Sequence, residues 1–217
     1  HSRWERKEYS IYACYIIAPM IGGMLESVFP LLPVLAMSIY MIINILFLMI
    51  QNLQIYNDAL TDLNNRRRLD QFLDERLPRV SAERPLTVMM IDINAFKAIN
   101  DACGHIEGDR ALRTFSDVLK KAAAQHDAFL ARYGGDEFCL LASAAGCAPA
   151  DLADEIHARL RRAQEGADKP YVLSASIGYT LCDRPENDSN AVLVRADEML
   201  YRSKQQWHQE SGRPTRK

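Results

Sequence analysis

The sequence holds few cysteines and no paired-cysteine motif. Its five cysteines show no Cys-x-x-Cys spacing, which argues against a structural zinc site and a disulfide scaffold. An excess of positive charge is also missing, because 26 basic and 28 acidic residues leave a formal net charge of −2. A broad nucleic-acid surface needs a basic footprint. We therefore expect no nucleic-acid partner.

Charge is almost absent from the N-terminal part of the chain. Between Ile11 and Ile50 the one charged side chain is Glu26. Leu31 to Ile50 is an apolar run about as long as the ~20 residues that cross a bilayer, and residues 11–29 form a second, weaker candidate. Basic residues flank this stretch on both sides, which favours a hairpin with both ends in the cytoplasm.

These observations predict a membrane anchor. Residues 1–50 are expected to form a transmembrane helical hairpin, the end of a larger membrane sensor region, and 51–57 a linker helix. The chain would then be a multi-pass protein of the inner (cytoplasmic) membrane, with the lipid bilayer as a partner and its catalytic part in the cytoplasm. The alternative is a helical hairpin buried inside a soluble protein.

The remaining residues show the periodicities of a small α+β domain, for which we predict the bounds 58–210, followed by a disordered tail at 211–217. Four apolar runs predict strands, and two amphipathic stretches between them predict helices. In chain order the expected elements are strand Leu86–Ile93, helix Gly108–Gln125, strands Phe129–Tyr133 and Phe138–Ala142, a helix from Pro149, and strand Tyr171–Leu181. The order βαββαβ predicts a ferredoxin-like palm with an antiparallel sheet whose first strand lies between the third and the fourth.

Acidic residues gather at one expected edge of that sheet. Asp92 lies near the end of the first strand, and Asp136 and Glu137 follow the glycine pair of the hairpin. Three carboxylates close together need a counter-charge at neutral pH, and oxygen ligands suit Mg²⁺, which completes its shell with substrate phosphates. Lys97 could neutralise those phosphates. Taken singly, Asp92 could instead cap a strand end and the hairpin could be a solvated tip.

The segment around these glycines resembles a family signature. Ala131-Arg132-Tyr133-Gly134-Gly135-Asp136-Glu137-Phe138 is similar to the motif of the GGDEF family, the diguanylate cyclases. Three further blocks agree in order and spacing: Asp58 to Arg67, Asp92 to Asp109, and Leu193 to Lys204. The resemblance covers roughly residues 57–205, and the apolar segment before it is similar to the membrane sensor region of some members.

The resemblance implies a nucleotidyltransferase that condenses two GTP into cyclic di-GMP with release of two pyrophosphates. It implies two Mg²⁺ per site, with Mn²⁺ as an alternative, and a homodimer, because one domain holds one GTP. The implied metal ligands are Asp92, the Ile93 carbonyl, Asp136 and Glu137, of which Asp136 and Glu137 are also the implied catalytic residues. The implied substrate-binding residues are Phe96, Lys97, Asn100, His105, Asp109, Gly134, Gly135 and Lys204.

Purely structural roles remain possible for four of these substrate-binding residues. Asn100 and Asp109, which the resemblance implies as the readers of guanine, could be helix caps. His105, implied to border the nucleotide, could be bonded to backbone, and Lys204 could be a solvated lysine on an exposed helix.

The chain departs from the family pattern at two places. Many members carry an inhibitory product-binding Arg-x-x-Asp before the glycines, and here Gln125 and Ala128 occupy those positions. We therefore predict no such product site. Trp207 and His208 replace a common Gly and Arg, which predicts weaker triphosphate binding unless Arg202 substitutes.

Two competing functions remain at this point. One is a catalytically weak or inactive domain that only binds GTP or relays a signal. The other is a cyclase with altered base choice, against which Asp109 argues.

Overall fold

The computed structural model of the protein describes residue 17 and residues 19–29, 33–165 and 170–212. Its contacts divide the chain into two compact units, His1–Ile55 and Tyr56–Lys217, and each is described by itself. Part of the expected N-terminal hairpin and residues 213–217 of the expected tail lie outside the described residues. Ser211 still belongs to the last helix.

Within the described part of the first unit, the backbone is mostly helical. Residues 19–28 are helical, and α2 (Val34–Tyr56) begins a few residues later. The backbone N–H of Leu35 donates to Glu26 Oε2 at 3.0 Å, so this carboxylate satisfies a donor at the start of α2 that the helix itself leaves unpaired. Glu26 therefore has a local structural role in the first unit.

The predicted membrane hairpin is not supported. Of the residues that the structure describes, no helix is both long and apolar enough to cross a bilayer. The same finding contradicts the predicted location in the inner (cytoplasmic) membrane. A lipid bilayer as a partner has no support.

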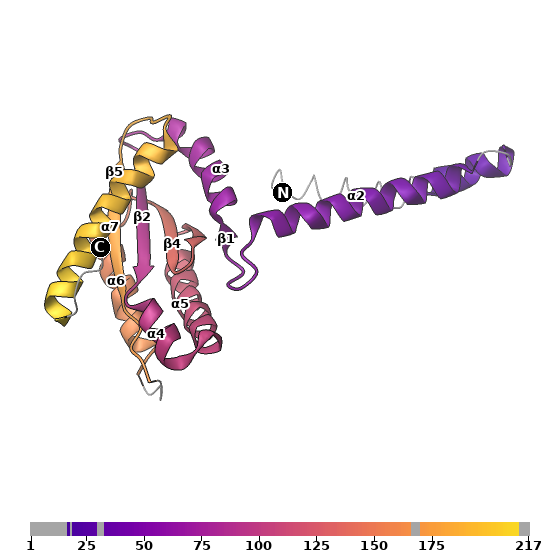
Figure 1. Ribbon diagram of the computed structural model, residues 1–217. Coiled ribbons are helices and arrows are strands. Elements are labelled where there is room, and N and C mark those ends of the chain that lie inside the picture. Colours follow the sequence, from indigo (N-terminus) through magenta and orange to yellow (C-terminus); the bar gives the residue numbers. More distant parts are fainter. Residues whose placement is uncertain (1–16, 18, 30–32, 166–169, 213–217) are drawn as a thin grey trace. The chain divides into compact units, whose positions relative to one another are not determined.

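The second unit is built on a five-stranded mixed sheet (Figure 1). In the order β1-β3-β4-β2-β5, the strands are β1 (Asn64–Asn65), β3 (Phe129–Gly134), β4 (Glu137–Ser143), β2 (Leu86–Ile93) and β5 (Ala175–Cys182). β1 runs parallel to β3, and all other neighbours are antiparallel. Every residue of β2 is buried, as expected for a central strand covered on both faces.

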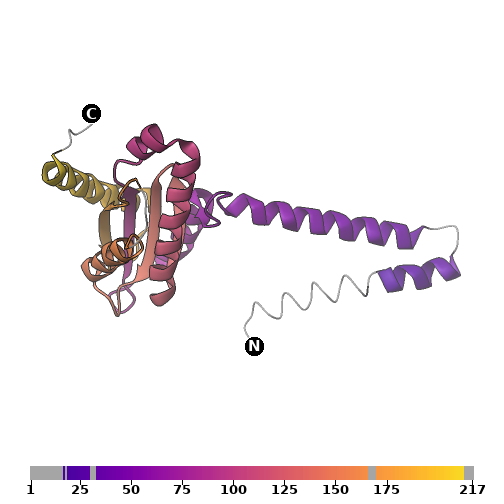
Figure 2. The same cartoon turned by 90° about the horizontal axis from the view of Figure 1, so that it is seen from below.

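Helices cover both faces of this sheet (Figures 1 and 2). They are α3 (Arg66–Arg76), the 3₁₀ turn η1 (Leu77–Arg79), α4 (Phe96–Cys103), α5 (His105–Gln125), α6 (Pro149–Arg162) and α7 (Ser189–Ser211). Met89 and Ile91 of β2 pack with α5 and α6 in one apolar cluster, whereas Val88 and Met90 pack with α3 and α7 in the other. The alternation of side chains along β2 therefore separates two cores.

The helix α7 lies unusually close to β5. A Cβ added at Gly178 would come within 1.9 Å of the backbone nitrogen of Leu200 and 2.4 Å of the Ala196 carbonyl oxygen. Only a glycine permits this approach. Because α7 is seated here, its next turn reaches the end of β2 that carries Asp92.

The predicted α+β palm is confirmed, with three differences in its elements. The strand order around β2 is as expected, but β1 was not foreseen and makes the sheet mixed. Two helices, α4 and α5, stand where one was expected. β5 begins at Ala175 rather than Tyr171, because residues 171–174 form irregular backbone.

Candidate active site

The acidic residues come together where β2 ends and β4 begins. Asp92 of β2 is the register partner of Glu137 of β4, and directly opposed residues in antiparallel strands have Cβ atoms about 4.5–5.5 Å apart. The backbone N–H of Ile93 donates to the Asp136 carbonyl at 3.2 Å. This bond ties the Gly134–Asp136 turn to the end of β2.

Lys204 of α7 supplies a positive charge at this edge. Its Nζ lies 2.8 Å from Asp92 Oδ2. Asp92 is 7% exposed, so the carboxylate of the ion pair is shielded from water, whereas the Lys204 side chain is 33% exposed. In this structure Lys204 therefore binds a site carboxylate, which answers the suggestion that it is only a solvated surface lysine.

One lysine does not balance the negative charge. Burial raises the pKa of Asp92 to about 6, the charges of Asp136 and Glu137 add to the rise, and Lys204 opposes it. Burial also raises the pKa of Glu137, and Asp136 adds to that shift. Each carboxylate thus makes ionisation of its neighbour harder, which is the electrostatic condition that a bound cation relieves.

The donor set suits a hard divalent cation, although its side chains are not gathered around one point. No group of three His, Cys, Asp or Glu side chains within the described ranges is placed to hold a metal ion, and Lys204 holds one oxygen of Asp92. The oxygens of Asp92, Glu137 and the Ile93 carbonyl are nevertheless the ligand types that Mg²⁺ prefers. These residues fit the ion in chemistry, and Asp92 would have to share or release Lys204.

The predicted guanine-reading residues lie on the α4–α5 hairpin. Asn100 is inside α4 and Asp109 is inside α5, while Gly104 is the N-cap of α5. The alternative that these two side chains cap a helix is therefore wrong. A Cβ at Gly108 would lie 1.9 Å from Asn100 Oδ1, so the Asn100 amide packs directly over α5. Asp109 and His105 are exposed.

The residues expected beside the phosphates begin α4. Ala95 has a left-handed backbone with φ 54° and forms the N-cap. Phe96, the first residue of the helix, is half-buried against the core, and Lys97 is exposed. A helix N-terminus beside a lysine can receive an anion.

One turn after Lys204 on α7, Trp207 and His208 contact each other edge to face at 5.1 Å between ring centroids.

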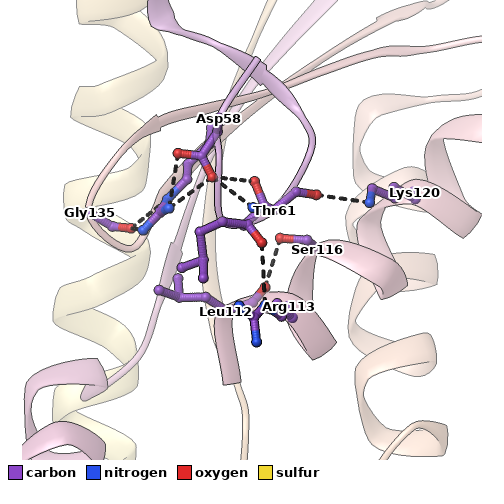
Figure 3. Close-up of polar contacts among 9 residues, drawn as sticks. Asp58, Thr61, Leu112, Arg113, Ser116, Lys120 and Gly135 are labelled. Atoms are coloured by element: carbon purple, nitrogen blue, oxygen red, sulfur yellow. Dashed lines mark hydrogen bonds and ion pairs between the residues drawn. The ribbon is translucent and has the colours of Figure 1, made fainter. Parts of the chain in front are cut away.

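Arg132, to which the sequence analysis assigned no role, binds the Gly134–Asp136 turn of the signature motif. Arg132 of β3 donates to the Gly135 carbonyl from Nε at 2.9 Å and from Nη2 at 2.6 Å. Its Nη1 also lies 2.9 Å from Asp58 Oδ1. Arg132 thus links Asp58 to Gly135, the two partners labelled in Figure 3. The signal was present, because Asp58 opens the first matched block and Arg132 stands in the signature, but the two residues are 74 positions apart in the chain.

A separate polar cluster includes Gln125, one of the two positions at which the sequence predicts that a product site is absent. Gln125 Oε1 accepts from Arg159 of α6, which also binds Glu155 at 2.7 Å. His126 Nε2 lies 2.7 Å from the same Glu155. These side chains satisfy one another, and Ala128 brings no polar group. The absence of a product site stays a prediction.

Comparisons with known proteins show which family the chain resembles. The family model described as "Diguanylate cyclase, GGDEF domain" matches residues 55–210. The chain is 35% identical over 153 residues to diguanylate cyclase DgcP of Pseudomonas aeruginosa and 34% identical over 150 residues to cyclic di-GMP phosphodiesterase PdeR of Escherichia coli. Each match covers 68% of this chain but only 22% of the relative.

Solved structures share the fold as well. The coiled coil and GGDEF domain of DgcB from Caulobacter crescentus, crystallised with c-di-GMP, superposes with a TM-score of 0.67 at 27% identity, covering 79% of this chain and 93% of that one. A sensory box/GGDEF family protein from Caulobacter crescentus gives 0.60 at 34% identity, covering 70% and 99%.

Proposed function

Because the chain belongs to the GGDEF family, we propose that it is a diguanylate cyclase that condenses two GTP into cyclic di-GMP and two pyrophosphates. The observation that carries the proposal is the meeting of Asp92, Asp136 and Glu137 at one sheet edge, with the pKa of Asp92 raised to about 6 and that of Glu137 also raised. Perturbed pKa values on neighbouring carboxyl groups are typical of functional sites, which supports a catalytic role over a purely structural one.

In the proposed reaction a ribose 3′-hydroxyl attacks the α-phosphorus of a second GTP. The new O–P bond forms as the α–β phosphoanhydride bond breaks, pyrophosphate leaves with the bond's electron pair, and Asp136 takes the hydroxyl proton. Asp92, Glu137 and the Ile93 carbonyl would hold Mg²⁺, which supplies charge stabilisation at the phosphates. Lys204, already at this edge, contributes a fixed positive charge.

Substrate recognition is assigned to α4 and α5. Asp109 accepts from the guanine N1–H and amino group, and Asn100 both donates and accepts. The lack of a side chain at Gly108 lets the Asn100 amide lie directly against α5. Phe96 and Lys97 adjoin the phosphates, Gly134 and Gly135 allow the turn to approach them, and His105 borders the nucleotide.

A direct assay tests this function. The purified chain, incubated with labelled GTP and Mg²⁺, should form cyclic di-GMP, and Glu137→Gln should reduce the turnover by roughly 100-fold or more, because a ligand of the cation that stabilises the phosphates is lost. Glu198→Gln, an exposed glutamate of α7, is the matched control and should keep normal turnover. Absence of product from the unmodified chain at all concentrations would exclude the proposal.

The second candidate is a GTP-binding signalling module without turnover. It is favoured by the Lys204–Asp92 ion pair, which occupies a ligand oxygen, and by the occurrence of this domain in a relative named a phosphodiesterase. Such a module would bind a non-hydrolysable GTP analogue, and Asp109→Ala would bind the analogue more weakly. It would form no cyclic di-GMP from GTP.

A further inference from the structure

Two hydrogen-bonded contacts hold consecutive carbonyl groups of the signature turn. On the β2 side, the Ile93 N–H donates to the Asp136 carbonyl. On the β3 side, Arg132 donates twice to the Gly135 carbonyl. The peptide units on both sides of the Asp136 Cα are therefore fixed, and so is the direction in which its side chain leaves the backbone.

The turn needs such a restraint, because its backbone is irregular. Gly135 has φ 44°, in the left-handed region. The register between β3 and β4 also shifts between Arg132 and Gly134, so the ordinary ladder does not hold the residues next to the turn. An exposed two-glycine segment without an external contact would sample several conformations.

Arg132 is in turn held by Asp58. Nη1 of Arg132 lies 2.9 and 3.1 Å from the two carboxylate oxygens of Asp58, and the arginine side chain is only 14% exposed. Asp58 Oδ1 also accepts from the backbone N–H and the hydroxyl of Thr61, at 2.9 and 2.7 Å. A guanidinium can serve both partners because its donors form a rigid planar fork.

The Asp58 loop is itself fastened to α5. Lys120 Nζ donates to the Thr61 carbonyl at 2.9 Å (Figure 3), and Arg113 reaches the Leu60 carbonyl at 3.5 Å. Burial, which alone would raise the pKa of Asp58, is outweighed by the hydrogen bonds from Thr61 and Arg132, so its pKa lies below the usual value. The anchor stays ionised at neutral pH.

We propose that Arg132, anchored by Asp58, is a positioning residue that aims Asp136 by holding the Gly135 carbonyl, and that turnover depends on this contact. The inference rests on the proposed cyclase function. It also means that the loop starting two residues after the end of α2 is in contact, through one side chain, with the reacting edge of the sheet.

Three variants of the full chain test the contact. Arg132→Lys keeps a positive charge but cannot serve Asp58 and Gly135 together, and Asp58→Asn keeps the shape but loses the charge. Each should lower kcat roughly 10- to 100-fold, since a displacement of about 1 Å at a reacting group has this effect. KM for GTP should stay within about threefold, because Asp136 is not a guanine contact. Arg113→Gln, which loosens the same loop without reaching the turn, is the matched control and should keep normal kcat.

The double variant adds a sharper criterion. If Asp58 acts only through Arg132, Asp58→Asn combined with Arg132→Lys should lose no more kcat than the stronger single variant, since residues that act as one unit are not additive. Multiplied losses would overturn the assignment of Asp58 as the anchor. Normal kcat in Arg132→Lys would overturn the whole inference.

Amide hydrogen exchange separates this inference from the proposed function. Exchange at residues 134–137 should be faster in Arg132→Lys than in Arg113→Gln, whether or not the chain makes cyclic di-GMP. Faster exchange in a chain that forms no product would support the turn contact while excluding the cyclase. Unchanged exchange would overturn the turn contact even in an active enzyme.

Discussion

At the scale of single residues, Asp92 is the carboxyl group of the site whose pKa is shifted furthest from its ordinary value. Burial raises its pKa in the folded chain to about 6, well above that of an ordinary aspartate, so the folded state holds the proton more tightly than the unfolded chain does. By linkage, this carboxyl favours folding below pH 4 and loses that contribution as the pH rises through about 6. The loss amounts to about 1–3 kcal/mol at pH 8.

Asp92→Asn should therefore stabilise the metal-free chain. We expect its free energy of unfolding in EDTA to exceed that of the unmodified chain by about 1–3 kcal/mol at pH 8, with the difference disappearing near pH 4. Urea unfolding at the two pH values measures it. Asp154→Asn, at an exposed position of α6, is the control. A destabilised Asp92→Asn at pH 8 would show that the Lys204 ion pair outweighs the burial of the carboxylate.

The sequence placed Asp92, Asp136 and Glu137 correctly at one edge, because strand ends can be read from apolar runs and turn glycines. It could not place Lys204 on Asp92. That contact depends on how closely α7 approaches the sheet, which is decided by the packing at Gly178. Nor could it pair Arg132 with Asp58, because the pairing depends on the short strand β1, whose two residues carry no periodicity.

At the scale of elements, the position of Lys204 depends on how α7 packs against β5. Gly178→Ala would place a Cβ 1.9 Å from the Leu200 nitrogen and 2.4 Å from the Ala196 carbonyl oxygen. Both are backbone atoms, so the helix itself must move. We expect a loss of about 3 kcal/mol or more in the free energy of unfolding, at or above the upper end for overpacked cores.

Chemical denaturation checks this expectation, with Gly146→Ala as the control, because a Cβ there meets nothing within 4 Å. A loss below about 1 kcal/mol in Gly178→Ala, as for an ordinary surface change, would mean that α7 can shift without penalty. Lys204 would then not be held in place by the packing of its helix.

Long periodic elements were predicted well and short ones were not. β2 and the amphipathic face of α5 follow from apolar patterns that span several residues. α4 has eight residues and a single buried one, Ile99, so its pattern gave no signal. The start of β5 was placed too early because apolar residues near Tyr171 pack on the core without joining the ladder.

At the scale of the whole molecule, the proposed reaction needs two chains. One domain presents one acidic edge, whereas two phosphodiester bonds must form between two nucleotides, so two edges have to face each other with approximate two-fold symmetry. Turnover per chain should then rise with protein concentration until the dimer is saturated. Measuring specific activity across a wide dilution series of the full chain checks this.

Mixing active and inactive chains gives a stricter test of the same requirement. If only dimers of two active chains complete the ring, Glu137→Gln added in equal amount to the unmodified chain should reduce the activity per active chain to roughly half, because half of each chain's partners are then inactive. The same mass of an unrelated inert protein is the control and should change nothing. Undiminished activity under conditions where the two chains exchange would show that a single acidic edge completes both bonds, and the homodimer would have to be abandoned as the catalytic species.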